Sequence, residues 1–135
     1  MRHQVAGRQL NRNTKARKAL FKSLLTSLIM KEAIETTEGK AKAIQGVFDK
    51  LVTKAKLGTV HVRRLLSAFL GNSEAVKKLV DDLAPRMDKR SSGFSRIAKL
   101  GVRRGDNASM VKMSIVDPKP VEVKAKKSTN LKSKV

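Results

Sequence analysis

Residues 40 to 58, KAKAIQGVFDKLVTKAKLG, carry the clearest structural pattern in this chain. Apolar side chains recur there at steps of three and four residues, which places them on one face of an α-helix. These side chains are Ile44, Val47, Phe48, Leu51, Val52 and Ala55. Thr37 is a residue type that starts helices, and Gly58 is the type that commonly ends them. The stretch therefore predicts a helix between these two residues with one face in a core.

Three other stretches show the same helical periodicity. Residues 15 to 32 predict the first helix, with Leu20, Leu24 and Leu28 recurring at steps of four residues on its apolar face. Residues 60 to 70 predict a third helix, and its inward side chains are expected to be Val62, Leu65, Leu66 and Phe69. Residues 73 to 83 predict a fourth helix, which should end at Pro85 because proline lacks the N–H that a helix interior needs.

Two later stretches alternate in the manner of β-strands. Residues 94 to 102 alternate loosely, residues 110 to 116 alternate more clearly, and residues 103 to 108 between them are typical of a turn. The inward positions of this hairpin are expected to be Phe94, Ala98, Leu100, Val102, Val111, Met113 and Ile115. A short strand over residues 33 to 36 would complete a small three-stranded sheet.

The order of these elements predicts an α+β fold in two layers: a helix, a strand, three helices and a two-stranded hairpin, with the helices covering the sheet. A chain of 135 residues suits one domain with a modest core. We expect an extended basic arm over residues 1 to 13, a globular domain over residues 14 to 116, and a flexible basic tail over residues 117 to 135.

Charge is the strongest functional signal in the sequence. The chain has 31 Lys and Arg against 11 Asp and Glu, a formal net charge of +20. Its first 31 residues carry eight basic side chains and no acidic one. Uncompensated positive charge repels itself in water and favours a dense array of negative charge, usually nucleic-acid phosphates. The lysines of the 40–58 helix form either a solvated face or phosphate contacts, and the pattern leaves both open.

Two regions are expected to make the phosphate contacts: the arm with the first helix, and the basic residues in and before the hairpin. The candidate RNA-binding residues are Arg2, His3, Arg8, Gln9, Asn11, Arg12, Asn13, Lys15, Arg17, Lys18, Lys22, Arg86, Arg90, Arg96, Arg103 and Arg104. Arginine can donate paired hydrogen bonds to phosphate oxygens, and the neutral polar residues add donors for sugars and base edges. For Arg103 and Arg104 the other interpretation is a solvated turn.

Other chemistry finds little support in the sequence. The chain has no Cys and two distant His, which disfavours a metal site, and the lack of Cys favours a reducing compartment such as the cytoplasm. Asp81 and Asp82 diverge on a helix, and no nucleophile or phosphate-loop motif is present, so we expect no enzyme, cofactor or small-molecule substrate. No apolar run reaches the ~18 residues of a membrane span, and no secretory signal is expected.

Two alternatives in other classes remain open. A DNA-binding architectural protein, of the kind that compacts a nucleoid, would bind any duplex DNA with similar affinity, usually as a dimer. A basic enzyme acting on RNA would need a cluster of acids or a histidine site, which these residues do not provide. The lack of Trp and Tyr also disfavours recognition of single-stranded bases by stacking.

Three separated motifs stand out: MRH at residues 1 to 3, GRQLNRN at residues 7 to 13 and RRGDNA at residues 103 to 108. They resemble the motifs of the bacterial L-seventeen family of large-subunit ribosomal proteins. The likeness covers the chain from Met1 to about Asp117, and Gly39 departs from the proline that the family often has there. The resemblance implies an α+β domain that binds large-subunit ribosomal RNA near the outer end of the peptide exit tunnel.

The same resemblance implies neighbouring ribosomal proteins as partners, a monomer within the assembly, and a place in the cytoplasmic ribosome. Charge and periodicity by themselves reach only a polyanion-binding α+β domain. We expect recognition of the shape and backbone of folded RNA, with little reading of base sequence.

Overall fold

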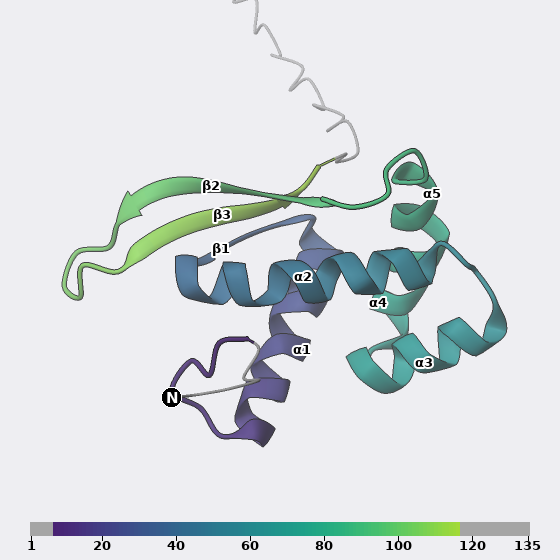
Figure 1. The fold of residues 1–135 in the computed structure, drawn as a ribbon, viewed down its shortest axis with the longest axis horizontal. Helices are drawn as coiled ribbons and strands as arrows, with labels where there is room; N and C mark the ends of the chain where they lie inside the picture. The colour runs from purple at the N-terminus through teal and green to yellow at the C-terminus, as the bar shows by residue number, and fades with distance from the viewer. Residues whose placement is uncertain (1–6, 117–135) are drawn as a thin grey trace, which may run out of the picture.

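The computed structural model describes residues 7 to 116. The predicted contacts Arg2 and His3, and the predicted tail over residues 117 to 135, lie outside the described residues. The elements follow in the order α1 (Thr14–Lys31), β1 (Ala33–Thr37), α2 (Glu38–Ala55), α3 (Val60–Leu70), α4 (Ser73–Lys78), the π-helical turn η1 (Leu79–Leu83), α5 (Ala84–Arg86), β2 (Ser95–Val102) and β3 (Ser109–Ile115). The predicted α+β fold is confirmed (Figure 1).

The strands form one antiparallel sheet in the order β1-β3-β2. In the central strand, Met113 pairs with Ile34 on one side and with Ile97 on the other. Val111, Met113 and Ile115 alternate inward and are at most 2% exposed, as predicted. Figure 1 shows the helices gathered on one side of this sheet, with α2 next to it.

Helix α2 supplies the centre of the hydrophobic core. Its residues Ile44, Phe48 and Val52 are fully buried on the face that the sequence predicts. Leu25, Leu28 and Ile29 at the C-terminal end of α1 are also fully buried and belong to the same core cluster. Each such side chain contributes about 1.5–3 kcal/mol on burial, so this cluster dominates the stability of the domain.

The two ends of α2 differ in detail from the prediction. Thr37 precedes the helix with extended backbone, but its side chain makes no capping hydrogen bond. At the other end Lys56 is the cap residue, and Gly58 follows it with φ +63°. The N–H of Gly58 donates to the carbonyl oxygen of Ala55 at 3.0 Å. Gly58 therefore turns the chain toward α3, in a backbone conformation that glycine adopts without strain.

Pro85 does not end the fourth helical segment, contrary to the prediction. Helix α4 continues through η1 into α5, and α5 contains Pro85. The N–H of Ala84 donates to the carbonyl oxygen of Leu79, five residues earlier, as in a π-helix. We attribute the continuation to this wider turn, because it relieves the clash between a proline ring and the carbonyl four residues before it.

Helix α3 buries a narrower face than the sequence predicts. Val62, Leu66 and Leu70 are at most 6% exposed, at steps of four residues. Leu65 and Phe69 are 46% and 38% exposed, so their prediction as inward residues is wrong. The helix packs along one stripe, which leaves the adjacent apolar stripe at the surface.

The β2–β3 hairpin projects beyond the helices (Figure 1). Phe94 just before β2 is fully buried as predicted, but Ala98, Leu100 and Val102 are exposed, which corrects the prediction. A bulge between Lys99 and Gly101 shifts the pairing at this point. Ala98 pairs with Lys112, on the sheet face turned away from the helices, whereas Ile97 pairs with the buried Met113 and packs against the core. Leu100 and Val102 lie at and after the bulge, near the end of β2.

Candidate nucleic-acid interface

The described part of the arm, residues 7 to 13, contains a tight turn. The N–H of Arg12 donates to the carbonyl oxygen of Gln9 at 3.1 Å, and Leu10 and Asn11 between them have φ values of +53° and +51°. A β-carbon on Gly39 would lie 3.9 Å from Leu10 Cδ2. The base of the arm therefore lies against the first turn of α2, at a distance where a side chain on Gly39 would make ordinary van der Waals contact with it.

Basic side chains from three elements act on Glu38 in that first turn. Lys42 is its hydrogen-bond partner, with 2.5 Å between Nζ and Oε1. This hydrogen bond is the main cause that lowers the pKa of Glu38, and the charges of Lys99 in β2 and Arg8 in the arm lower the pKa further. The arm, α2 and the hairpin thus bring positive charge to one place, around a single carboxylate.

Helix α1 holds the next group of basic residues. Asn13 Oδ1 accepts a hydrogen bond from the N–H of Ala16 at 2.8 Å, which caps the helix. Arg17 Nη1 donates to the carbonyl oxygen of Arg12 at 3.1 Å and links the arm to the helix. Three exposed lysines recur at steps of three and four residues, so they share one stripe: Lys15, Lys18 and Lys22.

The tip of the hairpin is held by a side-chain pair. Arg103 Nη2 lies 2.6 Å from Asp106 Oδ2, and Arg103 Nε donates to Asp106 Oδ1 at 3.1 Å. The hydrogen bond from Arg103, joined by one from the backbone of Ala108, lowers the pKa of Asp106 to about 2. Arg104 is exposed beside this pair. The turn is therefore ordered by Arg103, while Arg104 presents its guanidinium to solvent.

Arg86 lies in an internal ion-pair network and not beside the other predicted contacts. Its Nη2 is 3.0 Å from Glu32 Oε1 and 3.3 Å from Asp82 Oδ2, and its side chain is 20% exposed. Lys78 Nζ is 3.1 Å from the same Glu32 oxygen. Arg86 thus joins the end of α1 to the α4–η1–α5 segment, a pairing that no local pattern in the sequence reveals.

The remaining predicted residues lie on other surfaces. Arg90 is exposed in the loop after α5, and its carbonyl oxygen accepts a hydrogen bond from Lys56 Nζ. Arg96 is exposed in β2, on the sheet face turned away from the helices. Lys112 of β3 is exposed on that same face and was not predicted as a contact. Lys42 and Lys99 were also missed, because only the folded chain brings them beside the arm.

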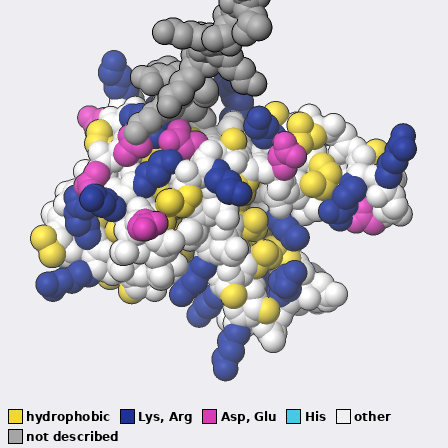
Figure 2. Space-filling view, turned by 180° about the vertical axis from the view of Figure 1, so that it is seen from behind, with side chains coloured by type: hydrophobic (Ala, Val, Ile, Leu, Met, Phe, Trp, Pro, Cys, Tyr) yellow, Lys and Arg dark blue, Asp and Glu magenta, His cyan; other side chains and the backbone are white. Residues whose placement is uncertain are grey.

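Basic side chains are spread widely over the molecule. Figure 2 shows Lys and Arg over the whole of one face, including the projecting hairpin, while acidic side chains gather in fewer places. Such a distribution suits a partner that surrounds much of the protein better than a small ligand in one pocket.

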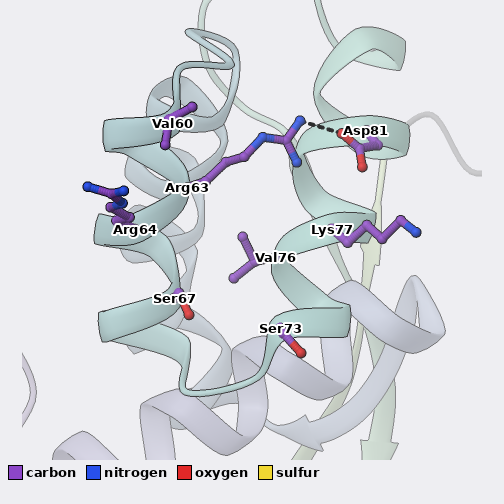
Figure 3. Close-up of a pocket in the computed structure, with 8 residues that line it drawn as sticks. All are labelled: Val60, Arg63, Arg64, Ser67, Ser73, Val76, Lys77 and Asp81. Carbon is purple, nitrogen blue, oxygen red and sulfur yellow. Dashed lines mark hydrogen bonds and ion pairs between the residues drawn. The ribbon is translucent and has the colours of Figure 1, made fainter.

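An open cleft lies between α3 and α4 (Figure 3). Arg63 reaches across it from α3, and its Nη2 lies 2.6 Å from Asp81 Oδ1. The hydrogen bond from Arg63 lowers the pKa of Asp81, and the pKa of Arg63 is raised in turn. Val76 also points into the cleft. The one carboxylate that lines it, among the residues described, is thus already bonded and unsuited to acid–base chemistry.

Two further kinds of site are absent from the described part of the chain. No group of three or more His, Asp or Glu side chains is placed to hold a metal ion between residues 7 and 116. Over the same residues, no helix has both the length and the apolar character needed to cross a bilayer.

The decisive comparison is with models of protein families. The model described as ribosomal protein L17 matches residues 20–116 of this chain. This chain belongs to the ribosomal protein L17 family. The match begins within α1 and takes in the whole described body after it, so membership rests on the folded domain and not only on the basic arm.

Individual L17 relatives extend the likeness over most of the chain. The large ribosomal subunit protein bL17 of Gemmatimonas aurantiaca is 46% identical over 116 residues, which cover 86% of this chain and 98% of that protein. The bL17 proteins of Anaeromyxobacter sp. strain K and Anaeromyxobacter dehalogenans are both 45% identical over 120 residues, 89% of this chain and 76% and 74% of theirs. The resemblance seen in the sequence motifs is confirmed.

Proposed function

We propose that this member of the L17 family is a structural constituent of the large ribosomal subunit and binds ribosomal RNA through its arm, α1 and the hairpin. Family membership supports the place in the subunit. The net charge of +20 supports a polyanionic partner. The observation that carries the RNA-binding surface is that the arm lies against α2, with Arg8 Nη1 3.8 Å from where a β-carbon on Gly39 would lie. The charges of Arg8 in the arm and Lys99 in the hairpin both act on the neighbouring Glu38.

Phosphate contacts are assigned first to exposed arginines and lysines at this end of the molecule. The arm offers Arg8 and Arg12, the stripe on α1 continues from them, and Arg104 extends from the hairpin tip. A guanidinium can donate two parallel hydrogen bonds to one phosphate. Arg103 positions the turn through Asp106, and Arg86 holds the body together, so both act on RNA binding indirectly.

The hairpin and the arm serve different purposes in this proposal. The hairpin is an ordered projection that can enter a space between RNA helices and contact backbone on either side. The arm base is fixed against α2 and α1, and it sets where the first residues of the chain meet the RNA. Recognition of shape and backbone follows, as expected for folded RNA, whose deep major groove excludes side chains.

We propose that this RNA-binding surface lies near the outer end of the peptide exit tunnel, as the family resemblance implies, and that the protein stabilises the folding of ribosomal RNA there. We propose that it acts there as a monomer among neighbouring ribosomal proteins, in cytoplasmic ribosomes, without a cofactor or a small-molecule substrate. Its role is then structural rather than enzymatic.

Cosedimentation tests the proposal directly. A tagged copy of the chain is expressed in a bacterium, and ribosomal subunits are separated on a sucrose gradient after a high-salt wash. The tagged protein should remain with the large subunit, because contacts with the shape of folded RNA and with neighbouring proteins add to the phosphate contacts that salt weakens. Its recovery at the top of the gradient, with the large subunit intact, would contradict the proposal.

A competition experiment separates the ribosomal role from general DNA binding. The protein is bound to a labelled fragment of large-subunit RNA, and unlabelled duplex DNA of equal phosphate content is added. The ribosomal role predicts that DNA competes at least about tenfold less well than the same RNA unlabelled, because shape adds to the charge. Equal competition by any duplex DNA would favour the architectural alternative.

A further inference from the structure

Helices α2 and α3 border a groove that is lined mainly by apolar side chains. Leu65 and Phe69 of α3 are its exposed members, and the partly buried Val47 of α2 also lines it. Lys50 and Lys54 of α2 complete the wall, and among the described residues the lining contains no carboxylate. The groove is therefore an apolar hollow with positive charge along one side.

The hollow is large enough to accept a bulky side chain. Its volume is about 180 Å³, and a cavity of about 150 Å³ is known to accept a benzene molecule. Leu65 and Phe69 are 46% and 38% exposed and lie one helical turn apart, so they leave adjacent apolar surface in water. An occupant with one or two large apolar side chains would remove that surface from water.

Protein fits this groove better than RNA does. A nucleobase in the hollow would place its polar edges against aliphatic carbons, where only the two lysines among the described lining residues can hydrogen-bond, and burial of polar groups without partners is costly. Phe69 is the sole aromatic side chain of this lining, so it offers no series of rings for successive bases. An apolar protein side chain has no hydrogen bonds to water to lose when it enters the hollow.

The lysines limit which protein segment can bind. Residues 117 to 135 of this chain contain six Lys and two acids, so their charge repels Lys50 and Lys54. A second copy of the chain, seated symmetrically on the groove, would place lysines opposite lysines. A segment with acidic residues beside its apolar ones would fill the hollow with apolar side chains and would attract Lys50 and Lys54 with its carboxylates.

We propose that the α2–α3 groove docks an amphipathic segment of another protein, one that carries large apolar side chains flanked by acidic ones. This inference deepens the proposed function and rests on it, because it assigns a surface to a neighbouring protein of the assembly. The apolar side chains fill the hollow beside Leu65 and Phe69, and the carboxylates pair with Lys50 and Lys54.

Model peptides test the groove on the full-length chain. The probe is a helical peptide of about 15 residues with leucines on one stripe and glutamates elsewhere. The first control peptide has the same composition in scrambled order. The second control peptide keeps the order but has lysine in place of glutamate. Binding is followed by NMR chemical shifts of the isotope-labelled protein at an ionic strength of about 0.15 M, which screens diffuse attraction to the basic surface.

The striped acidic peptide should shift the signals of Leu65, Phe69 and Val47, and it should bind about tenfold more tightly than either control. The double change Leu65→Ser and Phe69→Ser should weaken binding about tenfold or more, as removal of central apolar anchors does. Leu57→Ser is the matched control, since Leu57 is 67% exposed and lies outside the lining. The reversal Lys50→Glu with Lys54→Glu should transfer the preference to the lysine peptide.

Several results would overturn the proposal. Equal binding of the scrambled acidic peptide would reduce the effect to net charge. An RNA fragment that shifts Leu65 and Phe69 and displaces the peptide would make the groove part of the RNA interface. A dimer that forms through the groove, or shifts showing residues 117 to 135 seated in it, would replace the proposed occupant. None of these results bears on the cosedimentation of the chain with the large subunit, so the two proposals fail separately.

Discussion

Basic residues that look alike in the sequence differ at the residue scale in what they contact. Arg86 is mostly buried among Glu32 and Asp82, whereas Arg104 is exposed at the hairpin tip. A charge that is partly buried and paired contributes to stability, because its removal takes away part of the positive charge that compensates its partner carboxylates. An exposed charge contributes little to stability and is available to a partner.

Arg86→Ala should therefore destabilise the domain, by about 2 kcal/mol in the free energy of unfolding, since the pair is only partly buried. Arg104→Ala should change it by less than about 0.5 kcal/mol. Urea denaturation followed by circular dichroism measures both. At a temperature where both variants are folded, Arg104→Ala should weaken RNA binding more than Arg86→Ala does. An Arg86→Ala variant as stable as the parent would contradict the ion-pair assignment.

Asp106 gives a prediction for pH. Its pKa falls from 3.8 to about 2 because Arg103 hydrogen-bonds to the ionised carboxylate. A lowered pKa in the folded state means that the pair stabilises the hairpin tip above pH ~4 and that this stabilisation is lost as the pH falls toward 2. NMR titration of the Asp106 carboxyl group should show this pKa, and Arg103→Ala should return it to the ordinary range. An unchanged pKa in that variant would disprove the assigned cause.

At the scale of elements, the sequence predicts most of what local pattern controls. The helix periodicity from Ile44 to Ala55 and the alternation of β3 come directly from which faces are buried, and both are confirmed. The errors arise where burial or helix length depends on structure outside the local sequence pattern. Leu65 is apolar at helical spacing, yet no element covers its stripe, and Pro85 remains in a helix because of a π-turn that no sequence pattern marked.

The candidate site follows the same division. Composition and charge runs identify the arm, the α1 stripe and the hairpin tip, because these are local in the sequence. Glu32, one partner of Arg86, lies more than 50 residues away in the sequence. Lys99 and Arg8 come near Glu38 only once the sheet has folded. These are long-range pairings that periodicity does not report.

The hairpin can be tested as a separate element. Lys99 and Val111 face each other across the β2–β3 pair, so residues 100 to 110 can be replaced by an Asn-Gly turn that joins them. The shortened protein should fold, with a change in unfolding free energy within about 1 kcal/mol, because the removed residues include no buried core residue and only Met110 among them pairs with β1. Its affinity for ribosomal RNA should fall by about tenfold or more through loss of charge-assisted contacts at the tip.

A control for this change is Arg104→Ala in the intact hairpin, which keeps the Arg103–Asp106 pair that orders the turn. If the exposed charge of the tip carries the effect, this variant should lose a large part of the RNA affinity that the shortened protein loses. Full affinity in the shortened protein, measured by filter binding, would exclude the hairpin from the interface.

At the scale of the whole molecule, the account depends on a compact domain that orders a cationic surface. The core of α1, α2 and β3 is apolar and holds no ionised side chain among its buried described residues. The basic residues lie outside it, and Arg8 approaches a carboxylate whose hydrogen-bond partner is Lys42 rather than Arg8 itself. The arm is thus positioned by the domain while its charge stays available to phosphates.

The most direct test of this central claim is a salt titration of binding to a large-subunit RNA fragment, for the full chain and for a chain that lacks residues 1 to 13. Circular dichroism checks that the shortened chain is folded. Each phosphate contact contributes about 0.7–0.9 to the slope of log affinity against log salt, by analogy with DNA. The account predicts that the magnitude of the slope falls by about two to three, as expected for the loss of the three arginines of the arm. An unchanged slope and affinity in the folded, shortened chain would contradict it.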